Sequence, residues 1–176
     1  MKAKKCKVCK NEFTPIYTTA QSTCSLSCAI EHTAQKKSKA WNERKKILKD
    51  ELTTVQDLMK VAQQVFNKYI RLRDEGNLCI SCGKTINGVR HASHYLSAGG
   101  HSAVRFHLDN VWVSCFKCNV MLSGNGIEYR MRLINNIGVE RVEWLENNGS
   151  IPKKWTREEL KEIIELYKQK IKDFKN

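Results

Sequence analysis

The spacing of the eight cysteines is the feature that most limits how this chain can fold. They form two quartets of two close pairs each, Cys6-x2-Cys9 with Cys24-x3-Cys28 and Cys79-x2-Cys82 with Cys115-x2-Cys118. Four thiolates complete the tetrahedral sphere that structural zinc prefers, so each quartet predicts one closed Zn²⁺ site. In the first quartet His32 is an alternative fourth ligand. We favour Cys28 and expect His32 on a helix surface.

Charge and hydropathy indicate the class of partner. The 176 residues include 31 lysines and arginines against 18 acidic residues, a net charge of +13. Such a surplus favours nucleic acid over a membrane, because neutralising phosphates releases their counterions. The basic N-terminus lacks the apolar stretch of a signal peptide, and no window approaches the roughly 20 apolar residues of a membrane span. We therefore expect a cytoplasmic protein, in which paired cysteines bind zinc and do not form disulfides.

The sequence predicts an α+β protein in four segments. They are an N-terminal zinc knuckle (residues 1–32), a basic and amphipathic helical arm (33–76), a zinc-stapled core (77–138) and C-terminal helices (139–176). Capping boxes at Thr54 and Thr156 predict two helix starts. An apolar stripe from Val55 to Ile70 predicts a helix that packs either inside the monomer or against a second copy, so a homodimer is possible.

The first half of the arm is strongly basic. Between Glu31 and Asp50, seven lysines and arginines face three acidic residues, which gives this segment a net charge of +4. We interpret it as a helix that contacts DNA phosphates, and the alternative is a solvated helix face. The candidate DNA-binding residues are Lys36, Lys37, Arg44 and Lys45.

The order of parts in residues 77–138 is informative. Asn87-Gly88 predicts a β-hairpin turn soon after the first cysteine pair. A strand ending in His94, a glycine-containing loop, the Asp109-Asn110 pair and a second strand then lead to the second cysteine pair, and a helix is expected from about Asn125 to Ile137. This order is that of a zinc-stapled ββα-metal, or HNH, nuclease.

Several motifs carry a more specific resemblance. "CISCG", "HASHY", "RFHLDN", "CFKCN", "SGN" and "YRMRL", with the N-terminal "CKVCKNEF" and the closing "YKQKIKDF", resemble the NinG/Rap family of lambdoid phage recombination proteins. That family consists of structure-specific endonucleases acting on branched DNA such as Holliday junctions and D-loops. The resemblance implies the same activity here, in the cytoplasm of a bacterial host.

The resemblance also implies roles for four residues. His94, at the end of the first strand, is the expected general base, and Asn119, directly after the second cysteine pair, is an expected ligand of a catalytic cation. Asn110 is expected to brace the loop and orient the base. Many HNH sites have Asp or His immediately before the base, where this chain has Ser93. We expect His91 to replace it, in a site that accepts Mg²⁺ or Mn²⁺.

Basic and aromatic neighbours complete the predicted site. Arg105 and Arg130 are expected to contact phosphates, and Tyr95 or Phe106 is a candidate to stack on an unpaired base. Core packing is the alternative for each ring and is favoured for Phe106 and Trp112. The rival to the nuclease hypothesis is a non-catalytic zinc protein that binds or anneals nucleic acid, which has no use for a base and a second cation site.

Overall fold

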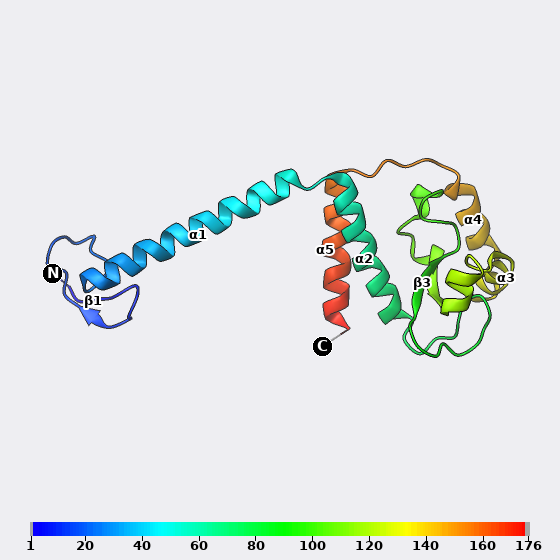
Figure 1. Cartoon of the computed structure of the whole chain (residues 1–176), viewed down its shortest axis with the longest axis horizontal. Coiled ribbons are helices and arrows are strands. Elements are labelled where there is room, and N and C mark those ends of the chain that lie inside the picture. Colours follow the sequence, from blue (N-terminus) through cyan, green and yellow to red (C-terminus); the bar gives the residue numbers. More distant parts are fainter. Residues whose placement is uncertain (1, 175–176) are drawn as a thin grey trace. The chain divides into compact units, whose positions relative to one another are not determined.

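The computed structural model describes residues 2–174 and is mostly helical, with two small antiparallel sheets (Figure 1). It divides into two compact units, residues 2–53 and residues 54–174. The predicted arm at 33–76 therefore contributes one helix to each unit. Across the described residues, no helix combines the length and apolar composition that a membrane crossing needs.

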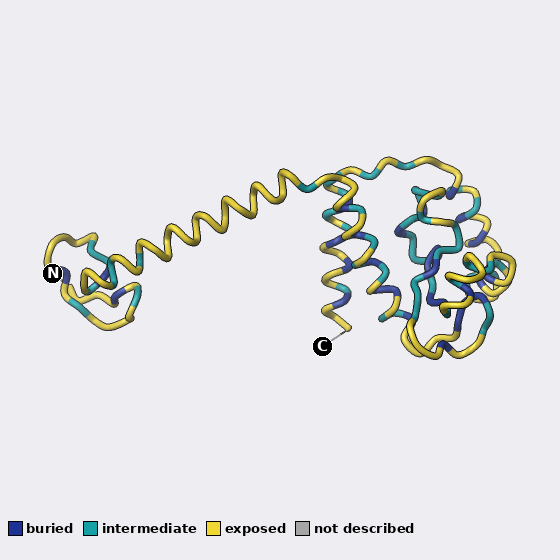
Figure 2. Tube along the Cα trace, in the orientation of Figure 1, coloured by how far each residue is buried: buried dark blue, intermediate teal, exposed yellow. Residues whose placement is uncertain are grey.

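The first unit is a knuckle followed by one long helix. Strands β1 (Lys4–Lys5) and β2 (Glu12–Phe13) pair antiparallel around the first cysteine pair. Helix α1 (Leu26–Leu52) begins at Ser25, whose hydroxyl accepts a hydrogen bond from the Cys28 backbone N–H at 3.3 Å. No residue of α1 is buried, and Figure 2 shows the helix exposed along almost its whole length.

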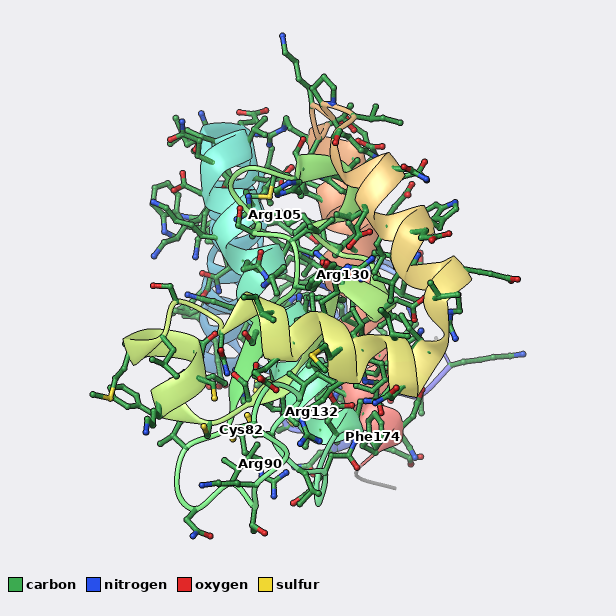
Figure 3. The ribbon with its side chains drawn as sticks, turned by 90° about the vertical axis from the view of Figure 1, so that its right-hand side faces the viewer. Cys82, Arg90, Arg105, Arg130, Arg132 and Phe174 are labelled. Carbon is green, nitrogen blue, oxygen red and sulfur yellow. The ribbon has the colours of Figure 1, made fainter. Side chains whose placement is uncertain are left out.

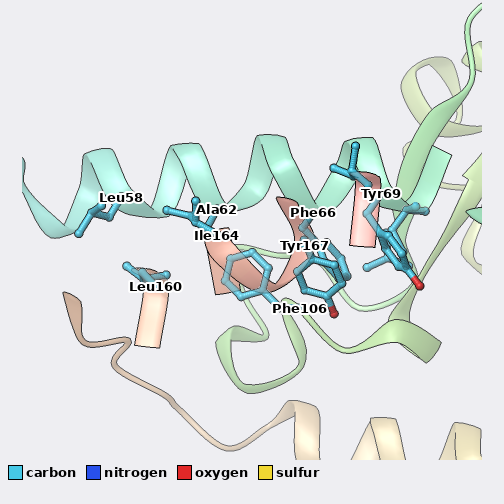
Figure 4. Close-up of a cluster of buried hydrophobic side chains, with 11 residues drawn as sticks. Leu58, Ala62, Phe66, Tyr69, Phe106, Leu160, Ile164 and Tyr167 are labelled. Carbon is cyan, nitrogen blue, oxygen red and sulfur yellow. The ribbon is translucent and has the colours of Figure 1, made fainter. Parts of the chain in front are cut away.

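Two helices that run parallel to each other form the main core of the second unit. Helices α2 (Val55–Arg73) and α5 (Arg157–Asp173) both begin at predicted capping boxes. In each box the threonine hydroxyl accepts from a backbone N–H, that of Asp57 or Glu159, and the carboxylate of that residue accepts from the backbone N–H of Thr54 or Thr156. Their apolar faces pack together around Phe66, whose ring lies 4.8 Å from that of Tyr167 and 5.6 Å from that of Phe106 (Figure 4).

This packing decides between the two readings of the apolar stripe. Leu58, Ala62, Phe66, Tyr69 and Ile70 are buried against α5 and the loop before β4. The stripe therefore packs inside one chain, which is one of the two alternatives that the sequence left open, and the homodimer stays a prediction. Burial of Phe106 confirms the packing interpretation of that ring.

A two-stranded sheet lies beside the helix pair. Strands β3 (His91–His94) and β4 (Val111–Ser114) pair antiparallel, with His91 opposite Ser114 and His94 opposite Val111. The loop between them contains the short 3-10 turns Ser102–Val104 and Leu108–Asn110. Both strands occur where the sequence predicts them.

The predicted hairpin at Asn87-Gly88 is wrong. Gly88 has the left-handed φ of +96° that a turn residue needs, yet residues 84–90 contain no strand. The residues before this turn form the cysteine loop, in which the Cys79 N–H donates to the Lys84 carbonyl at 2.9 Å, so they are not free to pair as a strand. The side chain of Arg90 donates to the carbonyls of Asp74 and Asn77, which fixes the segment without strand pairing.

The remaining helices follow the second cysteine pair. A π-helical turn (Lys117–Met121) leads through a left-handed turn into α3 (Gly126–Ile137), which ends at Gly138, and α4 (Val139–Gly149) follows directly. Ser123, Gly124 and Asn125 all have positive φ. This tight turn lets the Gly124 N–H donate to the Cys118 carbonyl at 2.8 Å and its carbonyl accept from the Ser81 hydroxyl at 2.9 Å.

Candidate active site and metal centres

The first cysteine quartet meets at the start of α1. The sulfurs of Cys6, Cys9, Cys24 and Cys28 all lie within 4.8 Å of one another, and Cys9 Sγ is 3.5 Å from Cys24 Sγ. Ligands at about 2.3 Å around tetrahedral zinc have sulfurs about 3.8 Å apart, so the donor set fits Zn²⁺. The fourth sulfur is that of Cys28, as predicted, and His32 lies outside the cluster. Although burial raises the pKa of Cys6, backbone N–H donors lower it to about 6.

The second quartet joins the start of the core to the end of β4. The sulfurs of Cys79, Cys82, Cys115 and Cys118 lie within 4.8 Å of one another. Burial raises the pKa of Cys79, but N–H groups of Cys82, Cys115 and Ser81 bring it down to about 7, which favours the thiolate a metal needs. The Cys115 N–H lies 3.4 Å from Cys79 Sγ. Both predicted zinc sites therefore have suitable ligand sets.

Gly83 and Arg132 cover one side of the second quartet. Gly83 has a φ of +68°, and a Cβ atom there would stand 2.2 Å from the Arg132 guanidinium carbon. Arg132 also donates to the Cys82 carbonyl at 3.4 Å. Figure 3 shows Arg132, Cys82 and Arg90 in the same part of the unit. The positive φ favours glycine at this position, and a side chain there would have to displace the Arg132 guanidinium.

His94 is held by one hydrogen bond. Its Nε2 atom lies 3.0 Å from the backbone carbonyl oxygen of Arg105. A carbonyl can only accept, so Nε2 carries the proton and Nδ1 is left with a free lone pair. Burial lowers the pKa of His94 below its ordinary value, and the Arg105 charge lowers it further, while the hydrogen bond acts in the opposite direction. The ring is therefore neutral at physiological pH.

Asn110 ties together the loop that supplies this carbonyl. The residue is fully buried, and its Oδ1 accepts from the Leu96 N–H at 2.8 Å. Its Nδ2 donates to the carbonyls of Leu96 and Val104, both at 3.0 Å. The side chain thus uses its amide fully to join the two ends of the loop that carries Arg105.

His91 faces away from His94. Alternate residues of a strand face opposite sides, so His91 and His94 occupy opposite faces of β3. The His91 ring lies 5.8 Å from that of Phe116, which immediately precedes the π-helical turn containing Asn119. The structure brings His91 close to this turn. Among residues 2–174, the two cysteine quartets are the only groups of three or more His, Cys, Asp or Glu side chains that lie close enough together to bind a metal ion.

The predicted phosphate-binding residues differ in their surroundings. Arg105 Nε donates to Gln63 Oε1 at 2.8 Å and Nη1 to the Ala98 carbonyl at 3.3 Å, and its other N–H groups have no partner among residues 2–174. Arg130 forms a two-point ion pair with Glu146, at 2.7 and 3.2 Å. Figure 3 shows Arg105 beside α2 and Arg130 beside α4. The four predicted cations of α1 (Lys36, Lys37, Arg44, Lys45) are all exposed.

Comparison with known proteins gives a consistent result. A model of the family described as "Bacteriophage Lambda NinG protein" matches residues 1–176. The chain belongs to the NinG family. The chain is 34% identical over 190 residues to protein ninG of Escherichia phage 933W, covering 98% of the chain and 94% of that protein. It is 33% identical over 191 residues to protein ninG of Salmonella phage P22, covering 96% and 93%.

The lambda relative is similar over a shorter stretch. Protein ninG of Escherichia phage lambda is 41% identical over 118 residues, which is 67% of this NinG-family chain and 57% of the lambda protein. No solved structure matches the chain at a significant level. Family membership confirms the resemblance drawn from the motifs.

Sequence reasoning missed several residues that shape the site in this NinG-family chain. Gln63 of α2 holds the Arg105 guanidinium, and its own Nε2 donates to Asn67 at 2.8 Å. Asp74, only 2% exposed, binds Arg73 through two side-chain hydrogen bonds and accepts from the Val113 N–H at 3.1 Å. An acidic residue beside a basic one at a helix end is a common pattern, and so is a glutamine within a helix, so neither position carried a usable signal.

Tyr95 is the remaining predicted contact to a base. Its hydroxyl donates to Glu146 at 2.5 Å, and its half-buried ring lies 5.6 Å from that of Tyr129. Burial and the Glu146 carboxylate raise the pKa of Tyr95 to about 12. The ring is part of the packing between the loop and α3, which leaves less of it available for stacking on DNA.

Proposed function

We propose that this NinG-family protein is a metal-dependent endonuclease that cuts branched DNA, such as Holliday junctions and D-loops, in phage recombination. Its catalytic core would be a ββα-metal fold made of β3, β4 and the helical segment after the second cysteine quartet. The four-cysteine Zn²⁺ site would join the two cysteine loops at the end of β4. The expected location of the activity is the cytoplasm of the bacterial host.

The observation that carries the proposal is the tautomer of His94. A histidine that merely fills space needs no defined tautomer, whereas a general base needs one nitrogen with a free lone pair and a neutral ring. The hydrogen bond from Nε2 to the Arg105 carbonyl leaves Nδ1 with a free lone pair, and the lowered pKa of His94 keeps the ring neutral. Both properties suit proton abstraction from water near neutral pH.

The proposed reaction is hydrolysis of a phosphodiester. His94 Nδ1 takes a proton from water, the water oxygen forms a bond to phosphorus, and the bond from phosphorus to the leaving oxygen breaks. The leaving oxygen then takes a proton from solvent water and departs as a hydroxyl group. Asn119 and His91 would hold the Mg²⁺ or Mn²⁺, which supplies positive charge for the leaving oxygen. In-line attack puts the incoming water and the leaving oxygen on opposite sides of phosphorus. The proposal therefore requires His94 and the cation ligands to act on opposite sides of the phosphate that is cut.

DNA binding would come from basic side chains on several parts of the chain. Arg105 lies next to His94, the proposed general base, and some N–H groups of its guanidinium are not used within the described part of the protein. We therefore propose that Arg105 binds the phosphate that is cut. Arg130 is neutralised in part by Glu146, which makes it a weaker phosphate ligand than the sequence alone indicates. Lys36, Lys37, Arg44 and Lys45 on α1 would bind phosphates through charge, since each is exposed.

The decisive experiment is nicking of a four-way junction. We expect cleavage with added Mg²⁺ or Mn²⁺ and none without added divalent cation. His94→Ala should lose at least about 10²-fold in rate while zinc content and junction affinity stay unchanged, because only proton transfer is removed. His32→Gln, in the other unit, is the matched histidine control and should cut normally. Junction binding without any cleavage by the wild-type protein would favour the rival, a zinc-dependent binding or annealing protein.

The cation ligands have their own test. Asn119→Ala and His91→Ala should both lower cleavage, and raising the Mn²⁺ concentration should restore part of it, because a missing ligand weakens cation binding but leaves the base in place. Ordinary activity of the His91 variant at low Mn²⁺ would remove that residue from the site and leave Asn119 as the protein ligand.

A further inference from the structure

One of the four tryptophans stands apart from the others. Trp112, Trp144 and Trp155 each contact an aromatic ring or a cation, at 4.5 Å from Arg73, 4.9 Å from His107 and 5.1 Å from Phe106 respectively. Trp41, in the middle of α1, makes no ring or cation contact within the part of the chain that the structure describes, and it is 63% exposed. An exposed tryptophan offers a large, rigid aromatic face on which another flat ring can stack.

The residues around Trp41 indicate what that surface binds. On a helix, residues three and four positions apart are neighbours. Trp41 therefore lies between Lys37 on one turn and Arg44 and Lys45 on the next. An aromatic face framed by cations fits a ligand that is both flat and anionic. A nucleotide combines the two, a base with a π-face and a phosphate beside it.

We propose that Trp41 is a stacking platform for an unpaired DNA base, with Lys37, Arg44 and Lys45 binding the phosphates that flank it. This inference rests on the proposed function in that it takes DNA as the partner. It adds a means of preferring branched DNA: in a duplex each base is stacked and paired, so its face is covered. Unpaired nucleotides at a branch or flap expose that face.

A second copy of the chain is a poorer occupant of this surface. The segment from Glu31 to Asp50 has a net charge of +4, so pairing it with its own copy brings like charges together. The cations that make self-association unfavourable attract a nucleic acid. Charge complementarity therefore selects DNA.

The test is a binding titration without added Mg²⁺ or Mn²⁺, so that no cleavage intervenes. Three fluorescein-labelled probes are compared by anisotropy, namely a flap with unpaired nucleotides, an oligothymidine and a fully paired duplex. Trp41→Ala should weaken binding to the flap and the oligothymidine about tenfold and leave the duplex unchanged. Trp41→Phe should recover much of the loss, because a phenyl ring still stacks. The slope of affinity against salt should not change, since no cation is removed.

Leu48→Ala is the matched control, because Leu48 is an exposed apolar residue on the same helix, 44% exposed, with no aromatic face. It should bind all three probes like the wild type. Equal losses on all probes for Trp41→Ala, or equal losses for the two variants, would overturn the stacking proposal. So would a dimer in sedimentation that both variants abolish. If the wild type binds none of the probes, the DNA function itself fails, whereas normal binding and cutting by Trp41→Ala removes only this inference.

Discussion

Replacing Asn110 by alanine should destabilise the second unit substantially. The substitution removes three hydrogen bonds of 2.8, 3.0 and 3.0 Å and leaves the N–H and the carbonyl of Leu96 without the Asn110 side chain, whereas the Val104 carbonyl keeps the hydrogen bond that it accepts from the His107 N–H at 3.1 Å. A buried polar group left unsatisfied costs about 1–3 kcal/mol. Leu96 is half-buried, so water compensates for part of this cost. We expect a loss of about 2 kcal/mol in the free energy of unfolding.

Urea titration followed by tryptophan fluorescence measures this loss, since three of the four tryptophans belong to the second unit. The midpoint should fall by about 1 M. Asn110→Asp is a sharper variant: it keeps the acceptor for Leu96 but sets a carboxylate oxygen against two carbonyls, so it should be at least as unstable at neutral pH. Asn147→Ala, an exposed position on α4, is the control. A midpoint for Asn110→Ala within about 0.2 M of the wild type would refute the view that Asn110 braces the loop.

Three further outcomes are expected. Metal analysis should find two zinc ions per chain. Circular dichroism should show that Cys118→Ser abolishes the cooperative unfolding of the second unit, whereas Cys9→Ser leaves it intact. Asp74→Ala should cost about 3–5 kcal/mol in thermal unfolding, because it leaves the partly buried Arg73 unpaired and frees the Val113 N–H. The acidic limb of the cleavage rate should lie below the ordinary histidine pKa of 6.5. The lowered pKa of His94 keeps the base neutral as the pH falls, so a limb at or above 6.5 in a pH–rate profile would contradict this assignment.

Features set by local chemistry were predictable from the sequence. The capping boxes at Thr54 and Thr156, the break between the first two helices and the end of α3 at Gly138 all depend on residues within one turn of each other. The cysteine quartets were equally clear, because ligand type and spacing follow from the coordination geometry of zinc. Each of these signals involves residues whose chemistry permits few alternatives.

Features set by competition between distant segments were not predictable. Asn87-Gly88 has the composition of a hairpin turn, but β3 pairs with β4, seventeen or more residues further along the chain, and Arg90 fixes the intervening segment. The apolar stripe of α2 was equally suited to a second copy or to α5, since both offer an apolar helix face. Hydrophobic periodicity identifies the buried face of a helix but not what covers it.

The state of His94 shows the same limit at the scale of a single proton. Its partner is the backbone carbonyl of Arg105, eleven residues away, and every residue has a carbonyl. The motif can therefore indicate that a base is present, whereas only the folded loop determines which nitrogen is free to act. Because Asn110 holds that loop closed, Asn110→Ala should lower the cleavage rate even at temperatures where the protein stays folded. The affinity for a junction should change little, since the phosphate-binding cations of α1 are untouched. A variant that cuts at the wild-type rate once folded would show that His94 keeps its tautomer without the loop.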